Sequence, residues 1–131
     1  MRASWEMSTI GHPLSDLVNL LMPYQLQNRI QLKSIPQFNE DSTRGLPSEQ
    51  QLIGWYAEES GWDPSPDLPW GIAFGMFRST CIFQGIAARY ALRQASSAWA
   101  RDIGVQRVPM GELAWKYVQM AREETEARAK L

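Results

Sequence analysis

The amino-acid sequence predicts a mainly α-helical fold, and two observations carry this prediction. Apolar residues recur every three or four positions in several stretches, which places their side chains on one face of a helix. No stretch alternates apolar and polar residues with the period of two that is typical of strands. At 131 residues the chain fits one small domain or part of a larger one.

The first predicted helix begins at Pro13, whose missing N–H would have no partner in the first turn. Its apolar face holds four residues at helical spacing, Leu14, Leu17, Val18 and Leu21. Because proline cannot continue a helix, Pro23 should end this one near Met22. Residues 24–47 have no periodicity and predict a long loop, which is functional or mobile in a compact domain.

The second predicted helix starts after Ser48, a residue type that caps helix N-termini. Its apolar stripe is formed by Leu52, Trp55 and Tyr56. Gly61 suits the left-handed residue that follows a helix end. Three prolines in residues 62–69 predict a connector.

The longest apolar pattern runs from Trp70 to Gln94 and has two stripes. One consists of Ile72, Met76, Phe83, Ala87 and Tyr90, and the other of Trp70, Phe74, Phe77 and Cys81. A helix that is apolar on so many sides is expected to be central and buried. Arg78, Gln84 and Arg89 interrupt it and argue against a transmembrane span. Its three glycines, Gly71, Gly75 and Gly85, predict close approach by a neighbouring helix or chain, because each lowers helix propensity.

Residues 95–108 read as a polar connector, and a last helix is predicted from about Met110. Its inward face is Leu113, Tyr117, Met120 and Ala121, and its charged end should project into solvent. Six tryptophans are many for this length. They fit either a surface on which carbohydrates or bases stack or the packing of a core. Core packing is favoured because most of them fall in predicted helices.

Composition excludes several classes of function. Thirteen Lys and Arg against fourteen Asp and Glu leave no basic stripe for nucleic acid. Cys81 is the only cysteine, so an internal disulfide is impossible, and with His12 as the only histidine a zinc site is not expected. No glycine-rich phosphate loop and no secretory signal are visible. The residues alone therefore indicate a soluble helical domain.

The stretch Trp-Glu-Met-Ser-Thr-Ile-Gly-His-Pro-Leu-Ser-Asp-Leu at residues 5–17 carries a resemblance. It resembles the aminoglycoside phosphotransferase family, in which Ile-Asp-Trp-Glu precedes Gly-Asp-Pro-x-x-Asp-Leu. The similarity is closest to the branch fused to, or associated with, acyl-CoA dehydrogenases. Residues 73–78, 84–86 and 95–98 agree with that branch, so the resemblance covers nearly the whole chain.

The resemblance implies that residues 1–131 are the helical C-terminal lobe of a protein-kinase-like fold, truncated and without its nucleotide lobe. The family's catalytic loop, with a base Asp and a metal-binding Asn, would precede residue 1, so no catalytic residue is expected here. Ser4 stands where the family has a second metal-binding Asp, and its hydroxyl is a poor Mg²⁺ ligand. Either Ser4 marks a decayed paralogue or the start is altered; the abrupt beginning inside a motif favours truncation. ATP and Mg²⁺ are the family's cofactors, and this chain alone is expected to bind neither.

Four residues acquire expectations from the resemblance, and Arg78 acquires one from its position in the apolar helix. Asp16 matches the carboxylate that braces the catalytic loop in the family. This role is favoured over the alternative, a simple interaction with the helix dipole. Without the catalytic loop, the Asp16 carboxylate would be partly buried and would lack its hydrogen-bond partners. Trp5 and Glu6 are candidates for the substrate cleft, although Glu6 fits an ordinary surface residue equally well. His12 replaces the family Asp before the proline and is expected to be structural. Arg78 is expected to form a structural ion pair and not to bind phosphate.

The function implied is that of a fragment of an ATP-dependent small-molecule phosphotransferase, contributing the substrate side and inactive alone. The acceptor would be a hydroxylated metabolite such as a hydroxyacyl thioester, contacted by residues 24–47 and 62–70. The alternatives are a pseudokinase-like domain that binds a ligand or a protein, and a docking domain associated with an acyl-CoA dehydrogenase. Loss of the upstream lobe should expose apolar surface on the helix that begins at Leu14 and cause self-association.

The last three residues, Ala129, Lys130 and Leu131, are a variant of the Ser-Lys-Leu peroxisomal address, and chance at a helix end is the alternative. We expect a fluorescent protein that ends in these residues to give a punctate pattern in cells. Diffuse fluorescence would contradict peroxisomal targeting.

Overall fold

The computed structural model describes residues 11–26 and 45–130. These residues form five helices: α1 (Leu14–Leu26), α2 (Glu49–Ser60), α3 (Leu68–Ala91), α4 (Ala100–Val105) and α5 (Arg107–Arg128). The described part of the chain contains no strand, so the mainly α-helical fold is confirmed. None of these helices is long and apolar enough to cross a membrane.

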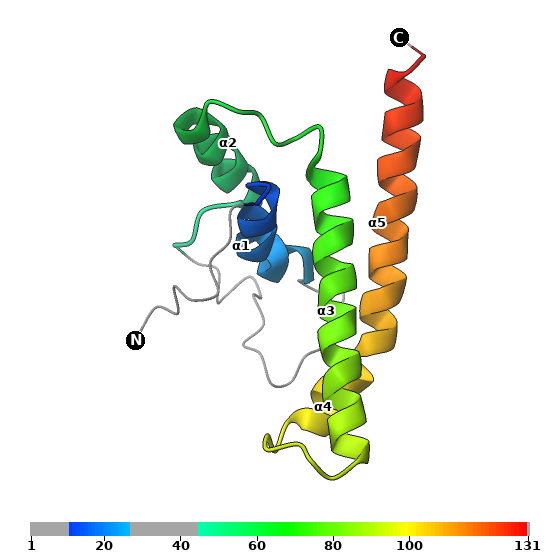
Figure 1. Ribbon diagram of the computed structural model, residues 1–131. Coiled ribbons are helices and arrows are strands. Elements are labelled where there is room, and N and C mark those ends of the chain that lie inside the picture. The colour runs from blue at the N-terminus through cyan, green and yellow to red at the C-terminus, as the bar shows by residue number, and fades with distance from the viewer. Residues whose placement is uncertain (1–10, 27–44, 131) are drawn as a thin grey trace.

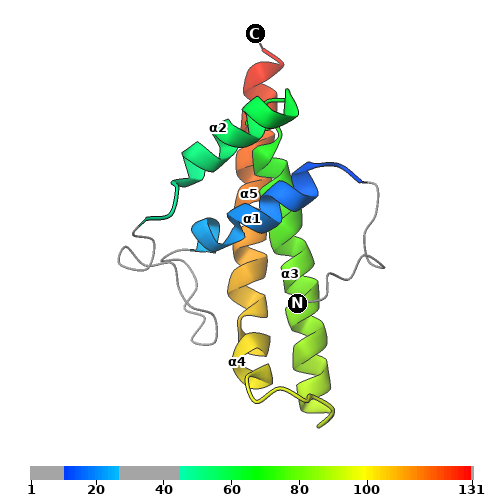
Figure 2. The same cartoon turned by 90° about the vertical axis from the view of Figure 1, so that its left-hand side faces the viewer.

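The two long helices, α3 and α5, form an antiparallel hairpin that spans the molecule, with α4 at the closed end between them (Figure 1). Viewed from the side, α1 and α2 form a second layer that crosses the hairpin (Figure 2). One buried cluster joins α1, α3 and α5; its fully buried large side chains include Leu17, Leu21, Met76 and Met110. The described residues therefore share one core, which lies where α1 crosses the hairpin.

The expected end of α1 near Met22 is wrong, because the helix continues through Pro23 to Leu26. Tertiary contacts hold this last turn in place. The Tyr24 hydroxyl donates to the carbonyl of Pro47 at 3.0 Å, and Gln25 hydrogen-bonds to Glu49 at the start of α2. These two bonds compensate for the stability lost because Pro23 has no N–H to donate to the helix backbone. Of the predicted 24–47 loop, the first residues are helical and 27–44 lie outside the described residues.

Both predicted ends of α2 are confirmed. The Ser48 hydroxyl accepts from the Gln51 amide at 3.2 Å, and the Gln51 side chain accepts from the Ser48 amide at 2.8 Å. This reciprocal capping box satisfies two N–H groups that have no partner within the helix. Gly61 follows α2 with φ of 68°, in the left-handed region that favours glycine.

The close approach predicted for the glycines of α3 is confirmed at two of three positions. A Cβ on Gly75 would lie 2.5 Å from Cγ1 of Val18, and one on Gly71 would lie 3.0 Å from Cδ2 of Leu14. These two glycines therefore allow α1 to pack directly against the backbone of α3. Nothing lies within 4 Å of the corresponding position at Gly85, so the prediction is wrong there.

The predicted polar connector 95–108 is partly helical. Its centre forms α4, in which Gly104 is buried and a Cβ there would lie 3.0 Å from Cβ of Ala87 in α3. The last helix starts at Arg107, earlier than expected. Its inward face is as predicted except for Met120, which is 40% exposed.

The expectation of core tryptophans is wrong for four of the five that the structure describes. Trp55, Trp70, Trp99 and Trp115 are between 42% and 58% exposed, and Trp62 is partly buried. The second stripe of α3 is exposed too, with Phe74 at 61% and Phe77 at 59%. Helical spacing shows which side chains share a face, but whether another element covers that face depends on the tertiary arrangement. Exposed apolar surface accordingly lies on α3 and α5, whereas the predicted face of α1 is buried.

Candidate functional site

A hollow of about 470 Å³ lies between the N-terminal half of α1 and α3. Its apolar surface comes from Leu14, Val18, Trp70 and Phe74, together with the backbone of Gly71 and Gly75. Its polar groups belong to His12, Ser15, Asp16 and Arg78. The hollow depends on the two glycines, since side chains there would meet α1. We call it the α1–α3 pocket.

His12 stabilises the start of α1. Its Nδ1 accepts a hydrogen bond from the Leu14 amide at 3.3 Å, so one N–H of the first turn gains a partner. The ring also meets Trp62 edge to face, with 5.4 Å between ring centroids. Both contacts agree with the structural role expected for His12, and the hydrogen bond requires a lone pair on Nδ1.

Asp16 lies in the first turn of α1 and lines the α1–α3 pocket. It is exposed, not partly buried as expected, because α1 packs on α3 through Leu14, Leu17 and Val18 instead. No described residue forms a hydrogen bond or ion pair with its carboxylate. Its position suits the helix dipole, and its oxygens are free to accept hydrogen bonds.

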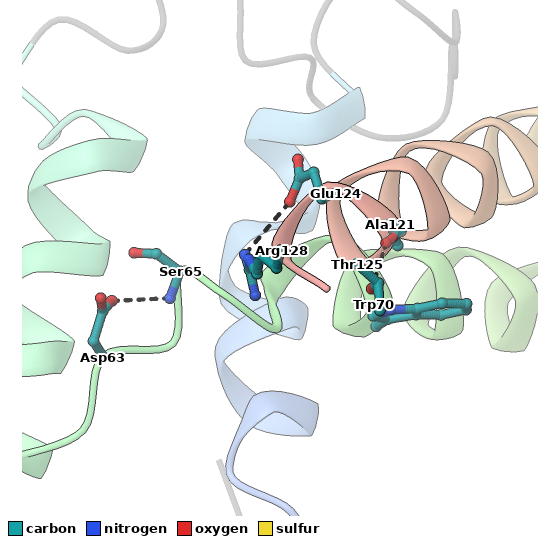
Figure 3. Close-up of polar contacts among 7 residues, drawn as sticks. All are labelled: Asp63, Ser65, Trp70, Ala121, Glu124, Thr125 and Arg128. Carbon is teal, nitrogen blue, oxygen red and sulfur yellow. Dashed lines mark hydrogen bonds and ion pairs between the residues drawn. The ribbon is translucent and has the colours of Figure 1, made fainter. Parts of the chain in front are cut away.

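Arg78 is half-buried and extends from α3 to α1, where its guanidinium donates to Oδ1 of Asn19. Its partner in the described residues is thus an amide, whereas a carboxylate was expected. The only ion pair within these residues joins Glu124 to Arg128 of α5, at 3.8 Å, as Figure 3 shows. Arg78 therefore links two helices at the edge of the pocket and still carries an unneutralised charge.

The remaining predicted site residues lie elsewhere. Ser4, Trp5, Glu6 and Leu131 are outside the described residues. Ala129 and Lys130 are exposed after the end of α5. No group of three or more His, Cys, Asp or Glu residues placed to hold a metal ion occurs in 11–26 and 45–130.

The connector between α2 and α3, which was expected to contact an acceptor, has a defined turn. The Ser65 amide donates to Oδ1 of Asp63 at 2.9 Å (Figure 3). Hydrogen bonds from the side chain and backbone of Ser65 lower the pKa of this exposed carboxyl. Asp63 is therefore engaged in fixing the turn.

Sequence reasoning missed a second hollow, a groove of about 320 Å³ between α3 and α5. It is lined by Trp70, Ala73, Phe74, Phe77, Gly111, Ala114, Trp115 and Val118. Trp70 and Phe74 border both hollows. The Trp70 indole N–H donates to Oγ1 of Thr125 at 3.4 Å, and that hydroxyl donates to the Ala121 carbonyl at 2.7 Å (Figure 3). The signal in the sequence that points to the groove is the second apolar stripe of α3, which helical spacing alone places in the core.

Comparison with known proteins gives relatives of much greater length. No protein-family profile and no solved structure matches the chain. Over 113 residues it is 30% identical to acyl-CoA dehydrogenase family member 10 of Mus musculus, covering 86% of this chain and 11% of that protein. It is 35% identical over 94 residues to acyl-CoA dehydrogenase family member 11 of Homo sapiens, covering 71% and 12%. It is 32% identical over 126 residues to the probable acyl-CoA dehydrogenase IBR3 of Arabidopsis thaliana, covering 91% and 15%.

The chain thus spans 11–15% of the length of these curated relatives. It is homologous to a short part of proteins named as acyl-CoA dehydrogenase family members, which agrees with the branch indicated by residues 5–17. None of these proteins is named as an aminoglycoside phosphotransferase.

Proposed function

We propose that this chain forms the acceptor-side helical lobe of an ATP-dependent small-molecule phosphotransferase within a longer polypeptide, and that it does not transfer phosphate by itself. The acceptor is a hydroxylated metabolite such as a hydroxyacyl thioester. Two observations support the proposal: the motif at residues 5–17, and the similarity to proteins named as acyl-CoA dehydrogenase family members. The same polypeptide, or an associated one, would carry the dehydrogenase.

A third observation, the α1–α3 pocket, carries the acceptor-binding part of the proposal. Its volume of about 470 Å³ lies within the range of small-molecule sites, and such sites are mostly apolar with a few placed polar groups. Leu14, Val18 and Phe74 offer an apolar surface to an acyl chain. Asp16 and Arg78 stand at the same pocket with opposite charges, suited to a hydroxyl and to a carbonyl or anionic group.

Little in the described residues supports a site for Mg²⁺–ATP. The α1–α3 pocket offers one carboxylate, Asp16, and no group of three or more His, Cys, Asp or Glu residues converges to hold a metal ion in 11–26 and 45–130. No glycine-rich loop presents backbone N–H groups to phosphates in this sequence. In our proposal ATP and Mg²⁺ are therefore held by other parts of the longer polypeptide. One oxygen of the Asp16 carboxylate would brace the catalytic loop, which leaves the other for the acceptor hydroxyl.

Calorimetry on the purified chain tests the proposal. We expect saturable binding of a hydroxyacyl pantetheine thioester, weaker binding of the same thioester without its hydroxyl, and no heat from Mg²⁺–ATP. Arg78→Leu should weaken thioester binding roughly 10- to 100-fold, because a hydrogen bond to a charged group contributes about 1.5–3 kcal/mol. Arg89→Leu, at an exposed position of the same helix outside the pocket, is the matched control.

Melting curves of both arginine variants are needed, because Arg78 also bonds to Asn19. If Arg78→Leu melts like the parent but binds thioester more weakly, a ligand contact is supported. Stoichiometric Mg²⁺–ATP binding would contradict the proposal, and so would a chain that binds no thioester.

The second candidate function is a pseudokinase-like helical domain that binds a ligand or a protein and takes no part in catalysis. The exposed aromatic residues of α3 and α5 favour it, because such patches are typical of interaction surfaces. Failure of thioester binding in a chain that still binds a protein partner would favour this candidate.

A further inference from the structure

The open side of the α3–α5 hairpin is unusually apolar. Four large aromatic side chains project from it, Trp70, Phe74 and Phe77 of α3 and Trp115 of α5. They are between 42% and 61% exposed. We call these four residues and the groove between the two helices the aromatic face.

Charge is nearly absent from this face. The exposed stripe of α3 continues at helical spacing through Trp70, Phe74, Phe77, Cys81, Gln84 and Ala88. The facing stripe of α5 runs through Val108, Gly111, Trp115 and Val118. Charged residues flank the two stripes, Arg78 on α3 and Glu112 and Arg122 on α5, but none lies between the aromatic side chains. Interface centres are depleted in charged residues and enriched in aromatic ones, so this composition is that of an interface.

The face carries both projections and a recess that could receive them. Phe74, Phe77 and Trp115 protrude, while Ala73, Gly111 and Ala114 give the groove a floor of small residues. A two-fold symmetric interface needs one surface that is complementary to itself. Aromatic side chains of one copy can fill the groove of another, and the lack of charge means that no like charges meet at the axis.

The available area suits a dimer. A fully buried aromatic side chain contributes about 150–250 Å², so these four half-exposed residues offer roughly 300–550 Å² per copy. The adjacent exposed residues, such as Val108 and Cys81, extend this toward the ~800 Å² per partner of a standard interface. Two hairpins of this length placed face to face would form a four-helix arrangement.

We propose that the aromatic face binds the same face of a second copy of this chain, giving a two-fold symmetric dimer of α3–α5 hairpins. Sedimentation equilibrium over about 1–100 μM, where interfaces of this size can dissociate, measures it on the intact chain. The expected result is a monomer–dimer equilibrium without larger species. A chain that stays monomeric over this range would overturn the proposal. That result would indicate that the aromatic face binds another part of the longer polypeptide instead. Open-ended association would overturn it too, because a symmetric interface closes at two copies.

Phe77→Lys locates the interface. In the monomer the ammonium group reaches water, since Phe77 is 59% exposed, but in the dimer it would be buried without a partner. We expect dimerisation to weaken at least about 100-fold, the equivalent of losing one well-buried interface residue. Trp115→Lys makes the same test from α5, should the first variant fold poorly.

Trp55→Lys is the matched control, because Trp55 is 52% exposed but belongs to α2. It should leave the dissociation constant unchanged, with helical content checked by circular dichroism for all variants. Equal weakening by the α2 and α3 variants, or none by Phe77→Lys and Trp115→Lys, would overturn the assignment of the dimer to the aromatic face.

Discussion

Leu21→Ala is expected to lower the free energy of unfolding by about 2–5 kcal/mol. Leu21 is 0% exposed and belongs to the cluster in which α1 meets α3 and α5. Removing its branched end leaves a cavity where the three helices cross, and the described residues form no second buried cluster that would compensate. Urea unfolding followed by circular dichroism measures the loss as a lower midpoint with an unchanged slope.

The neighbouring residue provides the control. Leu20 is 55% exposed, so Leu20→Ala should change the free energy of unfolding by no more than about 0.5 kcal/mol. The two substitutions are chemically identical and one position apart. Similar losses from both would mean that α1 does not bury the face assigned to it.

The parts of the fold that the sequence predicts are those determined by neighbouring residues. The four apolar residues of α1 are all buried as expected, because a period of 3.6 gives the same inward face in any helical context. The ends of α2 were predictable for a similar reason. A hydroxyl at Ser48 and a glycine at position 61 satisfy the termini of α2 by local hydrogen bonding and backbone geometry.

The parts that failed depend on contacts far along the chain. Pro23 was expected to end α1, but Tyr24 and Gln25 hold the next turn through partners near the start of α2. The aromatic stripe of α3 was expected in the core, yet α1 packs against the glycine side of that helix and leaves Phe74 and Phe77 exposed. The helical spacing of apolar residues alone does not show which of two apolar faces another helix will cover.

The candidate site shows the same division. The resemblance singled out Asp16, and the sequence singled out Arg78 as a charge within an apolar helix, each for its own reason. Their meeting at one pocket arises from the crossing of α1 over α3, which neither residue encodes by itself. Asn19 as the partner of Arg78 had no signal in the sequence, because an asparagine on the polar side of a helix is unremarkable there.

The crossing itself is tested by Gly75→Ala, which should destabilise the chain by up to about 2 kcal/mol. Alanine in a helix is favoured over glycine by about 1 kcal/mol, so the helix gains intrinsic stability. The new Cβ, however, would lie 2.5 Å from Cγ1 of Val18, a stiff β-branched side chain that cannot swing away. Overpacking of this kind typically costs about 1–3 kcal/mol and separates α1 from α3.

Gly85→Ala makes the same substitution in the same helix where nothing lies within 4 Å, so it should be neutral or stabilise the chain by up to about 1 kcal/mol. Both variants gain the same helix propensity, so the difference between their free energies of unfolding gives the cost of the contact between residue 75 and α1. Adding Val18→Ala to Gly75→Ala should then cost less than the two separate losses combined, because the smaller side chain makes room for the new methyl group. Strict additivity in urea unfolding would show that α1 does not cross α3 at Gly75, and the α1–α3 pocket would lose its geometric basis.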